Sequence, residues 1–402
     1  MDLATFRALL TDEGQTLLAA LQDTGPAEEP ATPAGLRRAH PAELLAAARE
    51  QVRLRRLAAA KFGRHAPHLY FTPDSVALSS HLAVSDYKLD RVLDELGVVM
   101  IDAMSLGSGA DAHVLGWSHA TSAVDGDRLT VEVAAANRTG MDEPMLDLTC
   151  ADVTTFDSQG EAVFIDLMRH AGPDGDHDPE RYDPPLSWAL ERLHTTGAGW
   201  IRLAPGVPDQ AVPDLGRAHE AEWISHDGHI QEAVLWFGLD GMRTSWPTTV
   251  RKATLLPARA SLTGRGLPHP AVRPVGRYLY APDPAVIHAR LLAELAEDLA
   301  AGLVEEAGTL LTADGLRPTP FATAYEVTEV LPFDSAGLKA VLRGRTVGRV
   351  TVAAVHGLQI EADAFHHDLT PQDPRAATVF ITGPASRPAM LITDPAPAAH
   401  TP

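Results

Sequence analysis

The sequence predicts an α/β protein built on an open, mostly parallel β-sheet, with helices before the sheet and a small α+β region after it. Seven apolar, strand-sized segments alternate with helix-like segments between residues 66 and 262. The first two of these strands flank a glycine-containing loop, as in a parallel crossover unit. The last two lie close together in sequence, which favours an antiparallel hairpin at one edge of the sheet.

Residues 1–65 are predicted to be helical. Leucines 9, 10, 17, 18 and 21 fall at helical spacing, and Pro41–Lys61 forms a second amphipathic run. The linker Gly25–Gly35 between them is poor in large apolar residues and is expected to be mobile.

The central region, residues 66–262, supplies the sheet. The seven expected strands are Val98–Asp102, Ala120–Asp125, Met145–Thr149, Ala162–Asp166, Gly199–Leu203, Ile230–Phe237 and Lys252–Leu256.

A Gly/Pro-rich bridge, Thr263–Gly276, precedes the C-terminal region, residues 277–396. We expect a helix over Ala285–Gly302 and another over Ser335–Arg343. Short strands are expected at Tyr325–Val330, Gly348–Ala353, Val379–Thr382 and Met390–Ile392. These elements indicate a small module of ferredoxin-like make-up, followed by a disordered Pro/Ala tail.

The loop between the first two strands carries the clearest functional pattern. The first strand ends near Asp102, the loop holds Gly107 and Gly109, and the second strand ends on Asp125. Glycines let a backbone approach a nucleotide-type cofactor, and a carboxylate about twenty residues later accepts hydrogen bonds from a ribose diol. Ala112 stands where dinucleotide enzymes prefer a third glycine, so spacing alone does not choose the cofactor. A purely structural crossover is the alternative.

Four carboxylates, Asp102, Asp125, Asp152 and Asp166, are predicted at the carboxyl ends of strands, where open α/β sheets bind ligands. The alternative for Asp125, Asp152 and Asp166 is an N-cap on the helix that follows.

Several motifs resemble those of bacterial class I methyltransferases with a THUMP-like C-terminal domain. Residues 107–111 (GSGAD) resemble the family's G-I-G-G-D turn, and 124–127 (VDGD) its V-D-x-D-P strand end. Further similar segments follow in the family's order: KFG at 61–63, FT at 71–72, AN at 136–137, VFID at 163–166, LAPG at 203–206, EWIS at 222–225, EAVLW at 232–236 and AYEV at 324–327.

The resemblance implies a Rossmann-like, seven-stranded methyltransferase core with S-adenosylmethionine as cofactor. The implied cofactor-binding residues are Asp102, Gly107, Gly109, Asp111, Asp125 and Asp152, with Asp125 at the ribose and Asp152 at the adenine amino group. Asp166 and Arg169 are implied on the side of the methyl acceptor. THUMP-type modules accompany RNA-modifying domains, so the implied acceptor is RNA, bound through the C-terminal region.

The chain also departs from the family pattern. The first motif has one extra residue before Gly107 and lacks an early glycine, so Met104 or Ser105 could crowd the cofactor. The family's D-P-A-R-R reads Asp166-Leu167-Met168-Arg169-His170, and its K-L-A-P-G lysine is Arg202. These changes raise a second hypothesis, a methyltransferase-shaped binding protein without turnover. An NAD-dependent oxidoreductase is a third.

Composition restricts the partners. The formal net charge is −20, so strong nonspecific nucleic-acid binding is not expected. Two local arginine clusters, residues 53, 55 and 56 and residues 343, 345 and 349, are interpreted first as solvated and paired with acids. A local nucleic-acid groove is the alternative. Cys150 is the only cysteine, which, with no expected signal peptide or membrane span, favours the cytoplasm. No metal site is expected, and His366-His367-Asp368 lacks further ligands at suitable spacing.

Overall fold

A computed structural model describes residues 1–22, 34–106, 109–141, 144–167, 178–207, 219–239, 249–332, 349–354, 376–382 and 389–396. The chain forms two compact units, residues 1–226 with 231–250, and residues 227–230 with 251–402. The predicted domain boundaries at residues 65 and 262–277 stay predictions. The linker expected at 25–35 falls largely outside the described residues, as do the C-terminal tail and the helix expected over 335–343.

The first unit begins with helices. They are α1 (Leu3–Leu9), α2 (Asp12–Gln22), α3 (Ala34–Ala39), α4 (Ala42–Phe62), the 3-10 helix η1 (Gly63–His68), α5 (Pro73–Leu78) and α6 (Leu82–Glu95). Leu9, Leu17, Leu18 and Leu21 are almost fully buried, because α1 and α2 turn these faces toward the apolar face of α4. Leu10, the C-cap residue of α1, is exposed.

Strands and helices then alternate along the chain. The strands are β1 (Met100–Met104), β2 (Ala120–Asp125), β3 (Leu146–Cys150), β4 (Ala162–Asp166), β5 (Gly199–Leu203), β6 (His219–His226) and β7 (His229–Phe237). The helices are α7 (Ala110–Leu115), α8 (Arg128–Met141), the short 3-10 helix η3 (Pro179–Arg181) and α9 (Leu186–Thr196).

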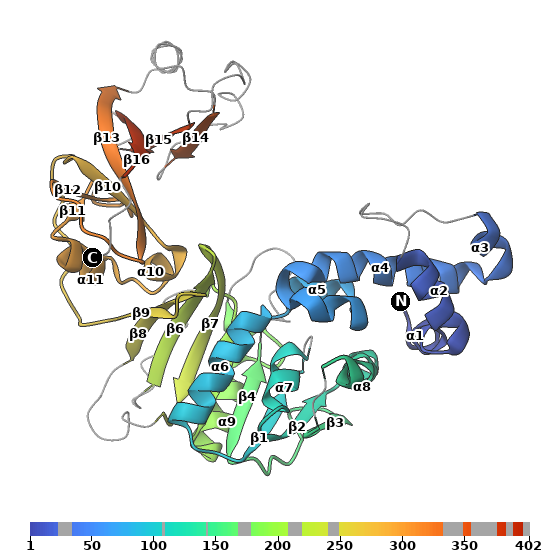
Figure 1. Cartoon of the computed structure of the whole chain (residues 1–402). Coiled ribbons are helices and arrows are strands. Elements are labelled where there is room, and N and C mark those ends of the chain that lie inside the picture. Colours follow the sequence, from blue (N-terminus) through green and yellow to red (C-terminus); the bar gives the residue numbers. More distant parts are fainter. Residues whose placement is uncertain are drawn as a thin grey trace. The chain divides into compact units, whose positions relative to one another are not determined.

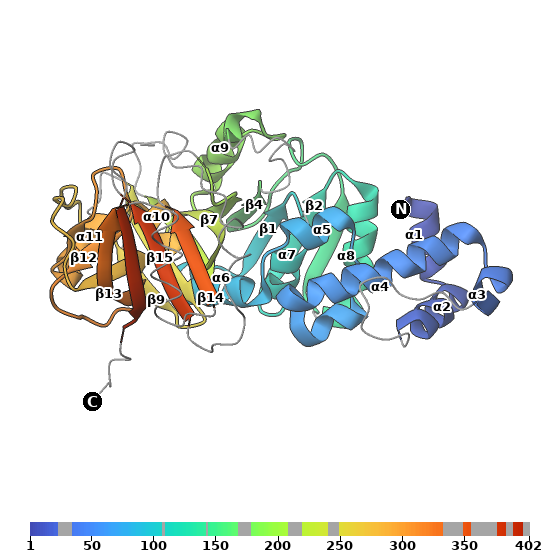
Figure 2. The same cartoon turned by 90° about the horizontal axis from the view of Figure 1, so that it is seen from above.

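Within the first unit the strand order is β3-β2-β1-β4-β5-β7-β6 (Figure 1). The first five strands are parallel, and β7 runs antiparallel to β5. In Figure 2, α9 lies on one side of β1 and β4 and α6 on the other. Because helices cover both faces of the sheet, the central strand β4 (AVFID) is apolar up to its last residue and shows no polar alternation. The expected α/β fold with a mostly parallel sheet is confirmed.

Three sequence expectations about this sheet are wrong. The hairpin expected between Ile230–Phe237 and Lys252–Leu256 does not form, because the neighbours of β7 in the sheet are β5 and β6. Strand β6 was not expected, although Asp227-Gly228 after it adopts positive φ at both residues, the conformation of a two-residue hairpin turn. Strand β1 runs two residues later than expected, so Asp102 lies in mid-strand beside Ser122 of β2 and Val163 of β4. Asp102 is therefore not at the carboxyl end of the sheet.

Two buried carboxamides join the helical region to the sheet. Gln51 of α4 donates to the carbonyl of Phe71 and accepts from its N–H, at 2.5 and 3.0 Å. Asn137 of α8 forms the same pair of bonds with Tyr70, at 3.0 and 2.7 Å. These bonds satisfy the backbone of residues 70–71, which no helix or strand pairs. They fix the start of the segment that leads through α5 to Ser80.

The second unit holds the hairpin β8 (Val250–Leu256) and β9 (Ala260–Thr263) and a second sheet of order β11-β12-β10-β13-β16-β15-β14. Those strands are β10 (Tyr278–Pro282), β11 (Gly302–Leu303), β12 (Leu311–Ala313), β13 (Ala322–Pro332), β14 (Arg349–Ala354), β15 (Ala376–Thr382) and β16 (Ala389–Pro395). This sheet has seven strands, more than the small module expected from the sequence would contain. The single helix expected at 285–302 is two, α10 (Pro284–His288) and α11 (Leu292–Leu299), which Arg290 separates with a φ of 59°.

Candidate functional site

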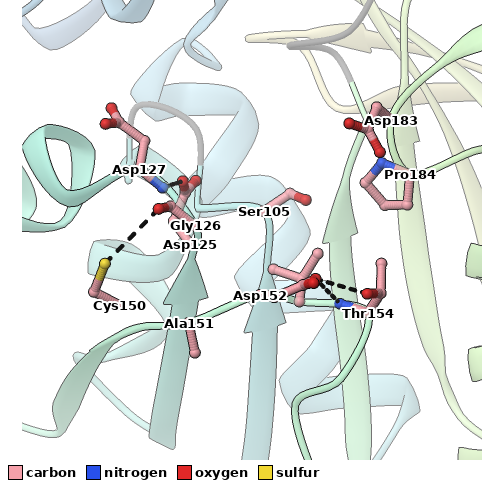
Figure 3. Close-up of a pocket in the computed structure, with 11 residues that line it drawn as sticks. Ser105, Asp125, Gly126, Asp127, Cys150, Ala151, Asp152, Thr154, Asp183 and Pro184 are labelled. Atoms are coloured by element: carbon pink, nitrogen blue, oxygen red, sulfur yellow. Dashed lines mark hydrogen bonds between the residues drawn. The ribbon is translucent and has the colours of Figure 1, made fainter.

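A cavity of about 740 Å³ opens at the carboxyl ends of β1, β2 and β3 in the first unit (Figure 3). This volume is in the range of small-molecule and cofactor pockets. The residues that line it come from the ends of these strands, the loop after β3 and the segment before α9: Ser105, Asp125, Gly126, Asp127, Cys150, Ala151, Asp152, Val153, Thr154, Asp183 and Pro184.

Two carboxylates lie at the end of β2 and have different roles: Asp125 is its last residue, and Asp127 follows it. Asp127 caps α8, because its side chain accepts bonds from the N–H groups of Leu129 and Thr130 and from the Thr130 hydroxyl. Asp125 is only 5% exposed and accepts from the N–H of Asp127 at 2.8 Å. The capping alternative therefore belongs to Asp127, and Asp125 lies at the cavity wall as a strand-end carboxylate.

Asp152 lies across the cavity from the tip of β2. One oxygen of its carboxylate accepts from the hydroxyl and the backbone N–H of Thr154, at 2.7 and 2.8 Å. These two bonds lower the pKa of the Asp152 carboxyl. The side chain is exposed, whereas its neighbour Val153 is buried in the wall. Asp152 and Val153 therefore place an ionised hydrogen-bond acceptor beside an apolar surface.

Ser105 follows β1 at the edge of the cavity with a φ of 57°, a left-handed conformation that side chains with a Cβ rarely adopt. We expect Ser105→Gly to raise the free energy of unfolding by roughly 0.5–1 kcal/mol, since relief of strain exceeds the added chain entropy of glycine. Ser105→Ala retains the Cβ and is the control. Urea unfolding in which alanine stabilises as much as glycine would contradict strain as the cause.

Beneath the sheet end lies a buried cluster of charges, which we call the Lys88 cluster: Lys61, Lys88, Asp111, Asp166, Arg202 and Glu232. Lys88 of α6 pairs with Asp111 of α7 at 2.8 Å and with Glu232 of β7 at 2.5 Å. Arg202 of β5 pairs with Asp166 at 2.9 Å and with Glu232 at 2.7 Å. The paired side chains are at most 7% exposed, so each charge depends on the others for its stability.

Backbone and hydroxyl groups complete the cluster. The Ser80 hydroxyl lies 2.9 Å from Asp111 and 2.8 Å from Glu232. Lys61 donates to the carbonyls of Val76, Ala77 and Ser79, at 3.0, 2.8 and 2.9 Å. Burial and the positive charge of Arg202 together lower the pKa of Lys61 to about 8, although Glu232 partly opposes this shift. The cluster thus holds the segment from α5 to Ser80 against the sheet.

Three comparisons identify the relatives of this chain. An uncharacterized S-adenosylmethionine-dependent methyltransferase of Mycobacterium tuberculosis strain H37Rv is 28% identical over 341 residues, 83% of this chain and 91% of the relative, and its counterpart in strain CDC 1551 matches equally. Residues 322–395 match the family described as THUMP domain-like, and residues 2–58 match a domain of unknown function (DUF8688).

A crystal structure of a protein from Porphyromonas gingivalis W83, described as a methyltransferase, superposes with a TM-score of 0.73. It covers 98% of this chain and 99% of its own, at 16% identity. The chain has the class I methyltransferase fold. The predicted family resemblance, enzyme class and cofactor are confirmed by relatives named as S-adenosylmethionine-dependent methyltransferases. Those names do not favour the hypothesis of a fold without turnover.

On this methyltransferase fold, only part of the predicted site comes together. Asp125 and Asp152 line the cavity. Asp111 and Asp166 belong to the Lys88 cluster. Asp102 accepts bonds from the Ser158 hydroxyl and the N–H groups of residues 159 and 160, and so secures the loop before β4.

The glycine loop and the acceptor side are described in part. Gly109 has a φ of 79° at the start of α7, a conformation suited to glycine. It is not among the residues that line the cavity. Gly107 and Arg169 lie outside the described residues. Among the described residues, no group of three metal-binding side chains gathers, and no helix is long and apolar enough to cross a membrane.

Sequence reasoning missed the partners in the Lys88 cluster, although signals were present. Lys88 stands four residues from both Val84 and Val92 on the buried face of α6, where a lysine requires a partner. Glu232 shares one face of β7 with Val234 and Trp236 by two-residue alternation. Each pattern indicates a buried charge, but neither names its partner.

Proposed function

We propose that this protein transfers a methyl group from S-adenosylmethionine, bound in the Asp125 cavity, to an RNA acceptor. The observation that carries the proposal is a buried strand-end carboxylate, Asp125, beside a cavity of cofactor size at the carboxyl edge of a parallel sheet. That edge is where open α/β sheets bind nucleoside ligands.

The residues present fit such a cofactor. Asp125 would accept hydrogen bonds from the ribose hydroxyls, and Gly126 next to it has no side chain to obstruct the sugar. Asp152 would accept from the adenine amino group while Val153 packs against the ring. S-adenosylmethionine supplies an activated methyl group, so the task of the protein is to align the acceptor and exclude water.

Asp166 remains our proposal for a residue on the acceptor side, with Arg169, whose position is not described. Arg202 lies 2.9 Å from Asp166 and stabilises its charged form in a buried setting. An ionised Asp166 could orient an N–H or O–H of the acceptor. Gly107, Gly109, Asp102 and Asp111 act in this proposal by shaping the loop and sheet around the cofactor.

Two measurements test the proposal. Calorimetric titration should show binding of S-adenosylhomocysteine and none of NAD, which would separate the methyltransferase from the oxidoreductase. Labelled S-adenosylmethionine should then transfer its methyl group to bulk cellular RNA and not to DNA or protein treated in parallel. Cofactor binding without transfer to any of the three pools would return the non-catalytic hypothesis to first place.

The THUMP-like match at residues 322–395 supports RNA as the acceptor. We expect removal of the positive charges of arginines 343, 345 and 349 to weaken RNA binding and to reduce the dependence of log K on log salt. Arg349 starts β14, and the other two lie outside the described residues. The same change at Arg259 and Arg290 is the control. An RNA affinity unchanged by the triple substitution would exclude this cluster as the contact.

A further inference from the structure

A second cavity, of about 690 Å³, lies in the helical part of the first unit and shares no residue with the Asp125 cavity. Helices α2, α4 and α8 and the 3-10 helix η1 contribute to its wall: Leu10, Gln15, Leu18, Ala19, Gln22, Arg55, Pro67, His68, Tyr70, Ala136 and Gly140. Gln15, Ala19, Gln22 and His68 are exposed, so solvent reaches it from one side.

Arg55 is the one strongly basic side chain in this wall and is only 8% exposed. Its Nε donates to the carbonyl of Leu69 at 2.8 Å, and one terminal nitrogen donates to Gln22 at 3.1 Å. The guanidinium lies 5.0 Å from the centre of the Tyr70 ring. The prediction of a solvated arginine face on α4 is therefore wrong for Arg55.

The charge of Arg55 lacks an acidic partner in the part of the chain that the structure describes. The wall contains no aspartate or glutamate, although the whole chain carries a net charge of −20. Burial accordingly lowers the pKa of the Arg55 guanidinium. A buried cation without a counterion is costly, and an anionic ligand would remove that cost.

The hydrogen-bonding groups around the cavity indicate the kind of anion. A guanidinium has five N–H donors, and the two bonds above leave at most three, because the Tyr70 side chain also bonds to the group. Gln15 and Gln22 already bond to Leu9, Tyr70, Pro67 and Arg55. A phosphate monoester carries up to two negative charges and three free oxygens, so it offsets a buried cation more fully than a carboxylate, which has one charge and two oxygens. The cavity is too large for phosphate alone, and its remaining wall is both polar and apolar.

We infer that this cavity binds a phosphate ester of nucleotide size, with Arg55 at the phosphate. The apolar side chains of Leu10, Leu18 and Ala136 then face the body of the ligand, and His68 lies at the exposed rim. The phosphate can belong to a free mononucleotide or to the 5′-phosphorylated end of an RNA strand. The inference is independent of the proposed methyl transfer.

The test is a calorimetric titration of the full chain at low salt, with S-adenosylhomocysteine saturating the other cavity. The probes are uridine monophosphate, a short 5′-phosphorylated oligouridylate and hexanoate. We expect uridine monophosphate to bind, and tighter binding of the oligouridylate would identify RNA as the source. Absence of binding at millimolar uridine monophosphate, or equal binding of hexanoate, would overturn the inference.

Two kinds of variant locate the site. Arg55→Gln should weaken binding at least tenfold, a factor typical of losing charge-assisted bonds. Because Arg55 also supports Leu69, Ala19→Phe provides a test that leaves Arg55 intact and fills the cavity from an exposed position. Ala20→Phe, exposed on the same helix but outside the wall, is the matched control. Equal affinity in the two phenylalanine variants would place the ligand elsewhere.

Discussion

Replacing Glu232 with glutamine is expected to lower the free energy of unfolding by about 3–5 kcal/mol. Glu232 is fully buried and contacts both Lys88 and Arg202, at 2.5 and 2.7 Å. Lys88 and Arg202 each share Glu232 with one further carboxylate, so glutamine removes a counterion from two buried cations at once. Urea denaturation monitored by circular dichroism measures the change.

Glu50→Gln is the control for this experiment. Glu50 forms an ion pair with Arg53 in which both side chains are 37% exposed, and such pairs contribute about 0–1 kcal/mol. A Glu232→Gln protein that loses no more stability than Glu50→Gln would show that the cluster tolerates the loss of this carboxylate.

The same residue predicts how stability depends on pH. Burial would raise the pKa of Glu232, but Lys88 and Arg202 reverse this and hold it well below its ordinary value of 4.5. The stabilisation is therefore complete above the unfolded-state pKa and is lost as the pH falls through the lower folded-state pKa. Between about pH 6 and pH 3, the wild-type protein should lose more stability than Glu232→Gln. Parallel pH profiles would contradict this assignment.

Replacing Asp125 with alanine is expected to weaken S-adenosylhomocysteine binding roughly ten- to a hundredfold, which corresponds to about 1.5–3 kcal/mol for hydrogen bonds to a charged group. The reason is that Asp125 is the buried strand-end carboxylate that would accept both ribose hydroxyls. Calorimetry on the folded variant measures the loss.

Asp147→Ala is the matched control for that measurement, because Asp147 is an exposed carboxylate on the neighbouring strand β3 and does not line the cavity. Its affinity should equal that of the wild type. If Asp125→Ala binds as tightly as Asp147→Ala, the cofactor does not use the tip of β2.

Local sequence patterns were sufficient to predict much of the core. The bounds predicted for β2, β4 and β5 agree with the structure, because each is a short, strand-sized run that ends at a polar residue or a turn. Asp125 could be predicted at a strand end for the same reason. Strand β6 was not predicted because His219, Glu220 and Glu222 give it the sequence of an exposed segment. All three side chains are in fact buried.

Tertiary structure alone decided which charges are buried together. Arg91 of α6 lies within 2.6 and 2.8 Å of Glu220 and Glu222, which makes the polar strand β6 compatible with the interior. Asp111 and Asp166 likewise look like site residues in sequence, but their partners Lys88 and Arg202 come from distant segments.

The physical reason is that the two kinds of information have different ranges. Periodicity and chain-end chemistry depend on neighbours a few residues away, so the sequence by itself determined the parallel sheet, its helices and the strand-end carboxylate Asp125. The stability of a buried charge depends on which counterions surround it in space. That balance placed Asp111 and Asp166 in a buried cluster of charges and left Arg55 facing a cavity, and it could be decided only once the chain was folded.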